Sequence, residues 1–197
     1  SNVLLEAKDE NLKITATDLD LIFIQNISNI EISEEGETTT SCSIMYDIVR
    51  KFNNEKKINF NLVSENKINL ESDKSSFNLN CLKASEFPIT EANFRENEFS
   101  LNSKKLLKLL NKCKFSVSND ETRHYLSGIF LHLTEKENKN FLTAVATDSH
   151  RMAISKTLLS EEIKFEPIIL PKKTIFQLCA LLDDYDGNVK ISNVKSK

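Results

Sequence analysis

The sequence predicts an α+β protein made of duplicated units, each an antiparallel sheet with helices on one side. Two observations support this fold class. Segments of the first half recur in the second half at a nearly constant spacing, which indicates an internal duplication. Apolar and polar residues also alternate over several short runs, as in half-buried strands. For 197 residues with 40% hydrophobic content, we expect two domains, residues 1–94 and 95–197.

The duplication is clearest around two Ala-Thr-Asp tripeptides. Each follows a Leu at the same distance, and the two aspartates, Asp18 and Asp148, have numbers that differ by 130. A period of this length is the size of a domain. Three pairs of segments match in the same order: 12–24 (LKITATDLDLIFI) with 142–153 (LTAVATDSHRMA), 46–52 with 176–182, and 58–60 with 189–191.

In the first copy, residues 8–11 (KDEN) form a polar turn, and Asp18 is expected to cap a second turn by accepting backbone N–H groups. Leu19, Leu21 and Phe23 continue the apolar alternation after it. Residues 33–40 are expected to be a loop, and Ser43 the N-cap of a helix over residues 44–52. Strands are expected at residues 3–7, 12–17, 58–62, 67–71 and 76–82.

The polar residues 90–97 are the expected linker to the second copy. A helix capped by Ser103 would follow a strand at residues 98–101, and a second helix is expected over residues 171–182. Further strands are expected at residues 127–134, 141–147 and 150–155. The first of these helices is expected to turn four residues towards the sheet: Leu106, Leu107, Leu110 and Cys113.

Lysines recur every four residues along that helix, at Lys104, Lys108 and Lys112. Lys172 and Lys173 place more positive charge at the start of the other helix. Such a row is either an ordinary solvated face or a surface that attracts phosphates. The formal net charge of −3 argues against a protein that coats nucleic acid, so any DNA contact must be local.

Several classes of site are not indicated. The four cysteines form no CxxC pair, and the spacing of His124, His132 and His150 does not match metal ligands. We therefore expect no metal and no cofactor. The sequence contains no apolar run long enough to span a membrane and no signal peptide, so a reduced, cytoplasmic location is expected.

Asp148, Ser149 and His150 are consecutive, whereas a catalytic triad needs three converging side chains. Consecutive residues near a strand end point in different directions. We expect no enzymatic activity, and a small hydrolase using these residues is the alternative. Assaying Ser149→Ala for turnover would separate the two.

Residues 142–153 resemble the second domain of the bacterial DNA polymerase III beta sliding clamps, together with 123–133 (RHYLSGIFLHL) before them and 168–182 (IILPKKTIFQLCALL) after them. Residues 1–21 and 75–90 are similar to the first domain. The resemblance implies the DNA-clamp fold and a processivity factor that encircles duplex DNA as a head-to-tail homodimer ring. It further implies a groove for short linear peptides of the replicative polymerase, the clamp loader and repair proteins.

The resemblance also implies site residues. Those near DNA would be Arg50, Lys104, Lys108, Lys112, Arg123, His124, Tyr125, Lys172 and Lys173. The peptide groove would use Leu126, Thr147, Ser149, His150, Arg151 and Met152, where Ser149 replaces the family's usual glycine. Phe77 and Leu79 match a pattern at the dimer interface, although strand alternation is satisfied equally well if both are core residues.

Compared with that family, we expect the chain to be a fragment that lacks the first helix, the end of the second domain and the third domain. The opposite wall of the peptide groove would then be absent. We therefore expect poor binding of clamp-binding peptides, and nanomolar binding in a titration would contradict this expectation.

Overall fold

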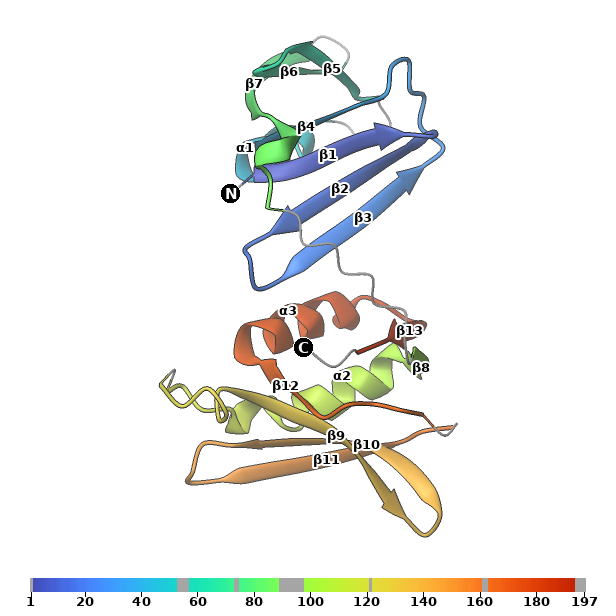
Figure 1. Cartoon of the computed structure of the whole chain (residues 1–197), viewed down its shortest axis with the longest axis vertical. Coiled ribbons are helices and arrows are strands. Elements are labelled where there is room, and N and C mark those ends of the chain that lie inside the picture. The colour runs from blue at the N-terminus through green and yellow to red at the C-terminus, as the bar shows by residue number, and fades with distance from the viewer. Residues whose placement is uncertain are drawn as a thin grey trace. The chain divides into compact units, whose positions relative to one another are not determined.

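The computed structural model describes residues 2–52, 57–72, 75–88, 98–120, 122–160 and 163–193. The chain divides into two compact units, residues 1–91 and 92–197 (Figure 1). The expected linker, residues 90–97, lies outside the described residues. Each unit is therefore considered by itself.

Unit 1 is a seven-stranded antiparallel sheet with the strand order β3-β2-β1-β4-β7-β6-β5. Its apolar core gathers Val3, Leu5, Ile68, Leu70 and Leu79 on one face, against which helix α1 packs. The elements are β1 (Asn2–Lys8), β2 (Asn11–Thr17), β3 (Ile22–Ser28), β4 (Gly36–Ser41), α1 (Cys42–Val49), β5 (Asn59–Ser64), β6 (Lys67–Ser72), β7 (Ser75–Leu82) and the 3-10 helix Ala84–Glu86.

Unit 2 has a four-stranded sheet in the order β11-β10-β9-β12 and a two-stranded sheet of β13 and β8. Helix α2 packs on β10 and β11, α3 packs on β9 and β12, and the two helices contact each other (Figure 1). The elements are β8 (Phe99–Asn102), α2 (Ser103–Asn111), the 3-10 helix Lys114–Ser116, β9 (Gly128–Lys136), β10 (Lys139–Thr147), β11 (Met152–Leu158), β12 (Ile168–Pro171), α3 (Lys172–Asp183) and β13 (Asn188–Ile191).

The expected duplication is confirmed. The order β3-β2-β1-β4 in unit 1 matches β11-β10-β9-β12 in unit 2, element by element. Helix α1 follows β4 and begins at Cys42, and helix α3 follows the matching strand β12 and begins at Lys172, again 130 residues apart. The antiparallel sheets with helices on one side agree with the predicted α+β class, most fully in unit 2.

The predicted loop at residues 33–40 is wrong, because β4 occupies most of it. Thr38, Thr39 and Thr40 are buried, although their polarity suggests a loop. Hydrogen bonds explain the burial of two of them: Thr39 Oγ1 donates to the carbonyl of Leu82 at 3.2 Å, and Thr40 Oγ1 to that of Asn80 at 3.0 Å. All three β-branched threonines pair with β1, and Thr39 and Thr40 satisfy their hydroxyl groups on β7.

Both predicted helix caps are also wrong by one or two residues. Ser41, not Ser43, is the N-cap of α1, which ends at Val49 rather than at residue 52. In unit 2 the side chain of Asn102 caps α2 by accepting the backbone N–H groups of Lys104 and Lys105. Ser103 is instead buried, and its hydroxyl donates to the carbonyl of Tyr185 at 2.9 Å.

The apolar side of α2 differs slightly from the prediction. Leu106, Leu110 and Cys113 are buried as expected, but Leu109 is buried as well and Leu107 is only partly covered. Leu109 belongs to the buried side because α2 contacts α3 in addition to the sheet. A helix that packs against both a sheet and another helix needs a wider apolar stripe than one that packs against a sheet alone.

Candidate functional site

The same turn follows β2 in unit 1 and β10 in unit 2. In unit 2, Thr147 Oγ1 donates to the carbonyl of Arg151 at 2.8 Å and accepts the N–H of Ser149 at 3.2 Å. Asp148 Oδ1 accepts the N–H groups of His150 at 3.1 Å and Arg151 at 3.0 Å. Two side chains at the start of the turn thus hold the backbone of residues 149–151, and these three residues are exposed.

Thr17 and Asp18 make the matching bonds in unit 1. Thr17 Oγ1 donates to the carbonyl of Leu21 at 2.8 Å, and Asp18 Oδ1 accepts the N–H of Leu21 at 3.0 Å. The predicted capping by Asp18 is therefore confirmed. Leu19 and Leu21 belong to this turn rather than to the strand, because β3 begins only at Ile22.

Five of the predicted groove residues, Thr147, Ser149, His150, Arg151 and Met152, belong to this turn or to the strand ends that flank it. Thr147 and Met152 pair across β10 and β11, and the Met152 side chain is 64% exposed. Ser149, His150 and Arg151 are exposed, whereas Leu126 is half-buried. An exposed methionine next to exposed backbone can make adaptable apolar contacts with a peptide.

Arg151 is held in place by two neighbours. Its Nε lies 2.9 Å from Asp148 Oδ2, and its guanidinium stands 5.5 Å from the centre of the Phe115 ring. Phe115 is 57% exposed and was not predicted as a site residue. The one feature of the sequence that could have indicated Phe115 is that it follows α2, the helix that carries the lysine row, within a few residues.

Two aspartates at this surface have lowered pKa values. Desolvation raises the pKa of Asp148, but hydrogen bonds from Arg151 and His150 and the Arg151 charge outweigh it and hold the pKa below 3.8. Hydrogen bonds from Thr122 and from Arg123 lower the pKa of Asp120. Both carboxylates are thus ionised at neutral pH and bind cationic or N–H partners.

The bonds of Asp148 and Ser149 do not form a catalytic triad. The carboxylate of Asp148 binds the main-chain N–H of His150, while the Ser149 hydroxyl accepts a hydrogen bond from Arg123 at 3.0 Å. A triad would instead run from the carboxylate through the imidazole ring to the hydroxyl. In the part of the chain that the structure describes, no group of three or more His, Cys, Asp or Glu side chains could hold a metal ion.

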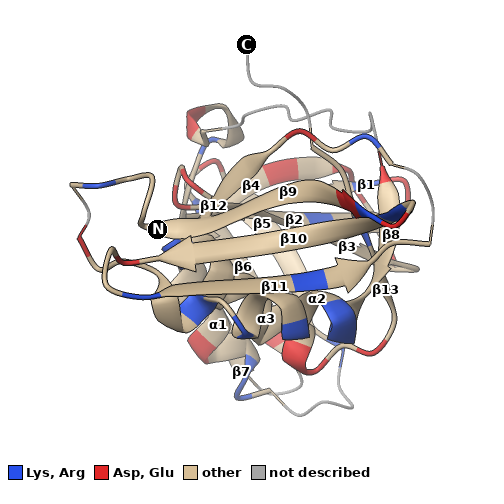
Figure 2. Cartoon of the chain, turned by 90° about the horizontal axis from the view of Figure 1, so that it is seen from below, with Lys and Arg blue, Asp and Glu red and all other residues tan. Residues whose placement is uncertain are grey.

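The predicted DNA residues fall into three places. Lys104 and Lys108 on α2 and Lys112 at its C-cap are exposed, opposite the buried leucines. Figure 2 shows basic positions in blue on the ribbon of α2. Lys104 Nζ donates to the carbonyl of Asp183 at 2.8 Å, which ties the start of α2 to the end of α3. Lys108 and Lys112 are thus the more available cations of the row.

Lys172 and Lys173 begin α3, as predicted. Lys172 Nζ donates to the side chain of Asn119, and the Lys172 N–H donates to the carbonyl of Ser127 at 3.0 Å. The start of α3 is therefore bonded to the segment that carries Arg123, His124 and Tyr125. Tyr125 is 67% exposed, which suits contact with a large partner.

Arg50 and the predicted dimer residues lie in unit 1. Arg50 ends α1, 3.1 Å from Asp47 and 5.4 Å from the centre of the Tyr46 ring. Phe77 is 41% exposed and Leu79 only 5%. Leu79 is thus a core residue of unit 1, while Phe77 offers a surface.

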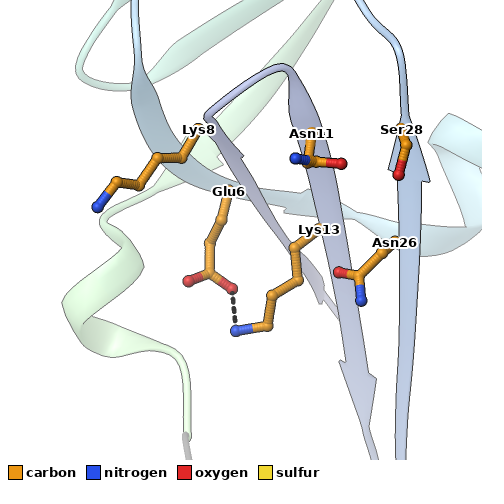
Figure 3. A pocket seen from close by; sticks show the side chains of 6 residues that line it. All are labelled: Glu6, Lys8, Asn11, Lys13, Asn26 and Ser28. Carbon is orange, nitrogen blue, oxygen red and sulfur yellow. Dashed lines mark ion pairs between the residues drawn. The ribbon is translucent and has the colours of Figure 1, made fainter.

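A shallow polar groove lies on the face of β1, β2 and β3 opposite the apolar core of unit 1 (Figure 3). None of the predicted DNA or peptide residues lines it. Its two central charges are paired, with Lys13 Nζ 2.9 Å from Glu6 Oε2. It is lined by Glu6, Lys8, Asn11, Lys13, Asn26 and Ser28.

Among the described residues, no helix is long and apolar enough to cross a membrane.

Known proteins resemble the chain in both units. Residues 1–91 match the family model of the DNA polymerase III beta subunit N-terminal domain, and residues 100–197 match that of its central domain. The chain is 30% identical over 193 residues to the beta sliding clamp of Caulobacter vibrioides, covering 97% of this chain and 52% of that one. It is 33% identical over 184 residues to the clamp of Rickettsia felis, covering 93% and 47%.

Solved structures agree. The Caulobacter crescentus pol III beta structure has a TM-score of 0.92 at 29% identity, covering 98% of this chain and 53% of that one. A sliding clamp of Bartonella birtlesii bound to griselimycin has a TM-score of 0.87 at 32% identity, covering 98% and 51%. The chain spans about half the length of the curated relatives it matches. It belongs to the DNA polymerase III beta subunit family, the beta sliding clamps.

Proposed function

We propose that this chain is part of a processivity clamp that encircles duplex DNA and tethers the replicative polymerase to it. The observation that carries the proposal is the exposed lysine row of α2, in a unit that matches the sliding clamp family. Lysines attract phosphates as point charges on flexible stems, without reading bases. Such contacts give weak, sequence-blind attraction, which suits a protein that must slide.

We further propose that the polymerase, the clamp loader and repair proteins bind through short peptides at the turn of residues 147–151. The exposed Met152 supports this role. The whole protein would be a cytoplasmic homodimer, and the exposure of Phe77 supports its part in the dimer contact more than that of the buried Leu79. Because Asp148 and Ser149 are bonded to groups other than an imidazole ring, we infer a binding role rather than catalysis.

The test is duplex binding by charge-reversed variants, measured by fluorescence anisotropy with two duplexes of unrelated sequence. Lys108→Glu should weaken binding equally for both duplexes. In a plot of log affinity against log salt concentration, the slope should become less steep by about 0.9 for each phosphate that the protein no longer neutralises. Lys108 is preferred to Lys104, whose reversal would also break the bond to Asp183.

Lys156→Glu is the matched control. Lys156 is an exposed residue of β11, next to Ser155, which is buried. Because side chains alternate along a strand, Lys156 lies on the sheet face opposite α2. The control should bind as the wild type does, and binding that ignores both salt and the Lys108 reversal would refute the proposed function.

A further inference from the structure

Arg123 makes a hydrogen bond between the segment that carries the proposed DNA residues 123–125 and the proposed peptide-binding turn 147–151. Arg123 lies in the segment of residues 122–127, here called the Arg123 loop, which carries the proposed DNA residues. Its Nε is 2.7 Å from Asp120 Oδ2, and its Nη1 donates to Ser149 Oγ at 3.0 Å. The second bond reaches the turn of the proposed peptide groove, 26 residues away in the sequence.

The Arg123 loop is fixed at its far end by other bonds. Ser127 Oγ donates to the carbonyl of Asp120 at 2.8 Å, and the carbonyl of Ser127 accepts the N–H of Lys172 at 3.0 Å. The carbonyl of Leu126 accepts the N–H of Ser118 at 3.0 Å. Within the described part of unit 2, the hydrogen bond between this loop and the turn is that of Arg123 with Ser149.

Comparison of the two copies of the turn shows what the Ser149 hydroxyl does. The turn requires a positive φ at this position, 77° for Ser149 and 79° for Leu19 in unit 1. Leu19 adopts the same conformation without a hydroxyl, since the turn is closed by the threonine and aspartate side chains in both copies. The Ser149 hydroxyl is therefore not needed to form the turn, and its described bond is the one to Arg123.

We propose that Ser149 is a positioning residue that holds Arg123, fixing the Arg123 loop against the groove turn and withholding this guanidinium from DNA phosphates. The withholding rests on the proposed function, whereas the positioning does not. The bonds of Nε to Asp120 and of Nη1 to Ser149 direct two of the five N–H donors of the planar guanidinium at protein acceptors. His124 and Tyr125 then remain as the exposed groups of the loop.

The first measurement is amide hydrogen exchange of the Arg123 loop in the whole chain, comparing wild type with Ser149→Ala and Ser149→Gly. Both variants remove the hydroxyl, but glycine relieves the positive φ and alanine does not. Loss of one hydrogen bond should accelerate exchange of the Leu126 and Ser127 amides by roughly twofold to tenfold in both variants. Unchanged exchange, or opposite changes in the two variants, would overturn the inference.

The second measurement is the salt dependence of duplex binding by the same proteins. Releasing Arg123 in Ser149→Ala should make the slope steeper by up to about 0.9, as expected when the protein neutralises one more phosphate. The double variant Ser149→Ala with Arg123→Ala should not show this steeper slope. An unchanged slope with faster exchange overturns the withholding of Arg123, whereas faster exchange in a chain that binds no duplex at low salt refutes the proposed function instead.

Discussion

Of the two glycines in unit 2, Gly128 and Gly187, Gly128 is the one where an added methyl group would meet another strand's backbone. A Cβ at this residue would lie 2.3 Å from the backbone oxygen of Leu170 and 2.7 Å from Cγ2 of Ile169. Since Cβ atoms essentially never come within 3.0 Å of a heavy atom in a residue that is not a chain neighbour, β12 must move away from β9. The backbone oxygen cannot yield without disturbing the pairing of Gly128 with Pro171 and of Ile129 with Leu170.

We expect Gly128→Ala to lower the free energy of unfolding by about 3 kcal/mol, the upper part of the range for overpacking. Gly36→Ala is the control, because no atom lies within 4 Å of a Cβ built there, and its effect should stay within about 0.5 kcal/mol. Urea unfolding followed by circular dichroism measures both. Should the two variants unfold at the same urea concentration, the close approach of β12 to Gly128 would be refuted.

Two further predictions concern the core and the groove turn. Leu110 is 0% exposed, so Leu110→Ala should lower the unfolding free energy by about 2–5 kcal/mol; Leu181→Ala, at a 57% exposed position, should show little change in the same urea assay. The folded pKa of Asp148 is lowered, so its stabilising contribution is present above its ordinary pKa of 3.8 and is lost as pH falls through the lower folded value. The stability gap between wild type and Asp148→Asn should therefore narrow below pH 3.8, and urea midpoints showing a constant gap across acid pH would contradict the assignment.

The sequence was sufficient for the duplicated framework because that framework depends on periodic patterns. Alternation places Leu12, Ile14 and Ala16 on one face of β2, and these residues pack against the core of unit 1 as the pattern requires. The strand β4 could not be recognised in the same way. Its buried threonines are satisfied by carbonyl groups of β7 that lie 40 and 43 residues later, and such a contact leaves no local signal.

The candidate site was predicted in part for the same reason. The exposure of Lys108 follows from the spacing of leucines on α2, which is a local property. The bond between Arg123 and Ser149 does not follow from any spacing, because it depends on how a loop and a turn meet in the folded unit. The roles of the predicted DNA, groove and dimer residues stay predictions that the variants above can test.

The two turns also show how a duplicated protein can assign different tasks to equivalent positions. Both copies use threonine and aspartate to fix the backbone, which leaves the residue with positive φ free to vary. In unit 1 this residue is Leu19, with a side chain that is 79% exposed, and in unit 2 it is Ser149, bonded to Arg123. Exchanging the two side chains should therefore preserve each turn while moving an exposed apolar group into the proposed groove and releasing Arg123. The threonine and aspartate common to both copies fix the turn. The surface chemistry of the turn in each unit depends on the residue with positive φ that follows the aspartate, Leu19 or Ser149.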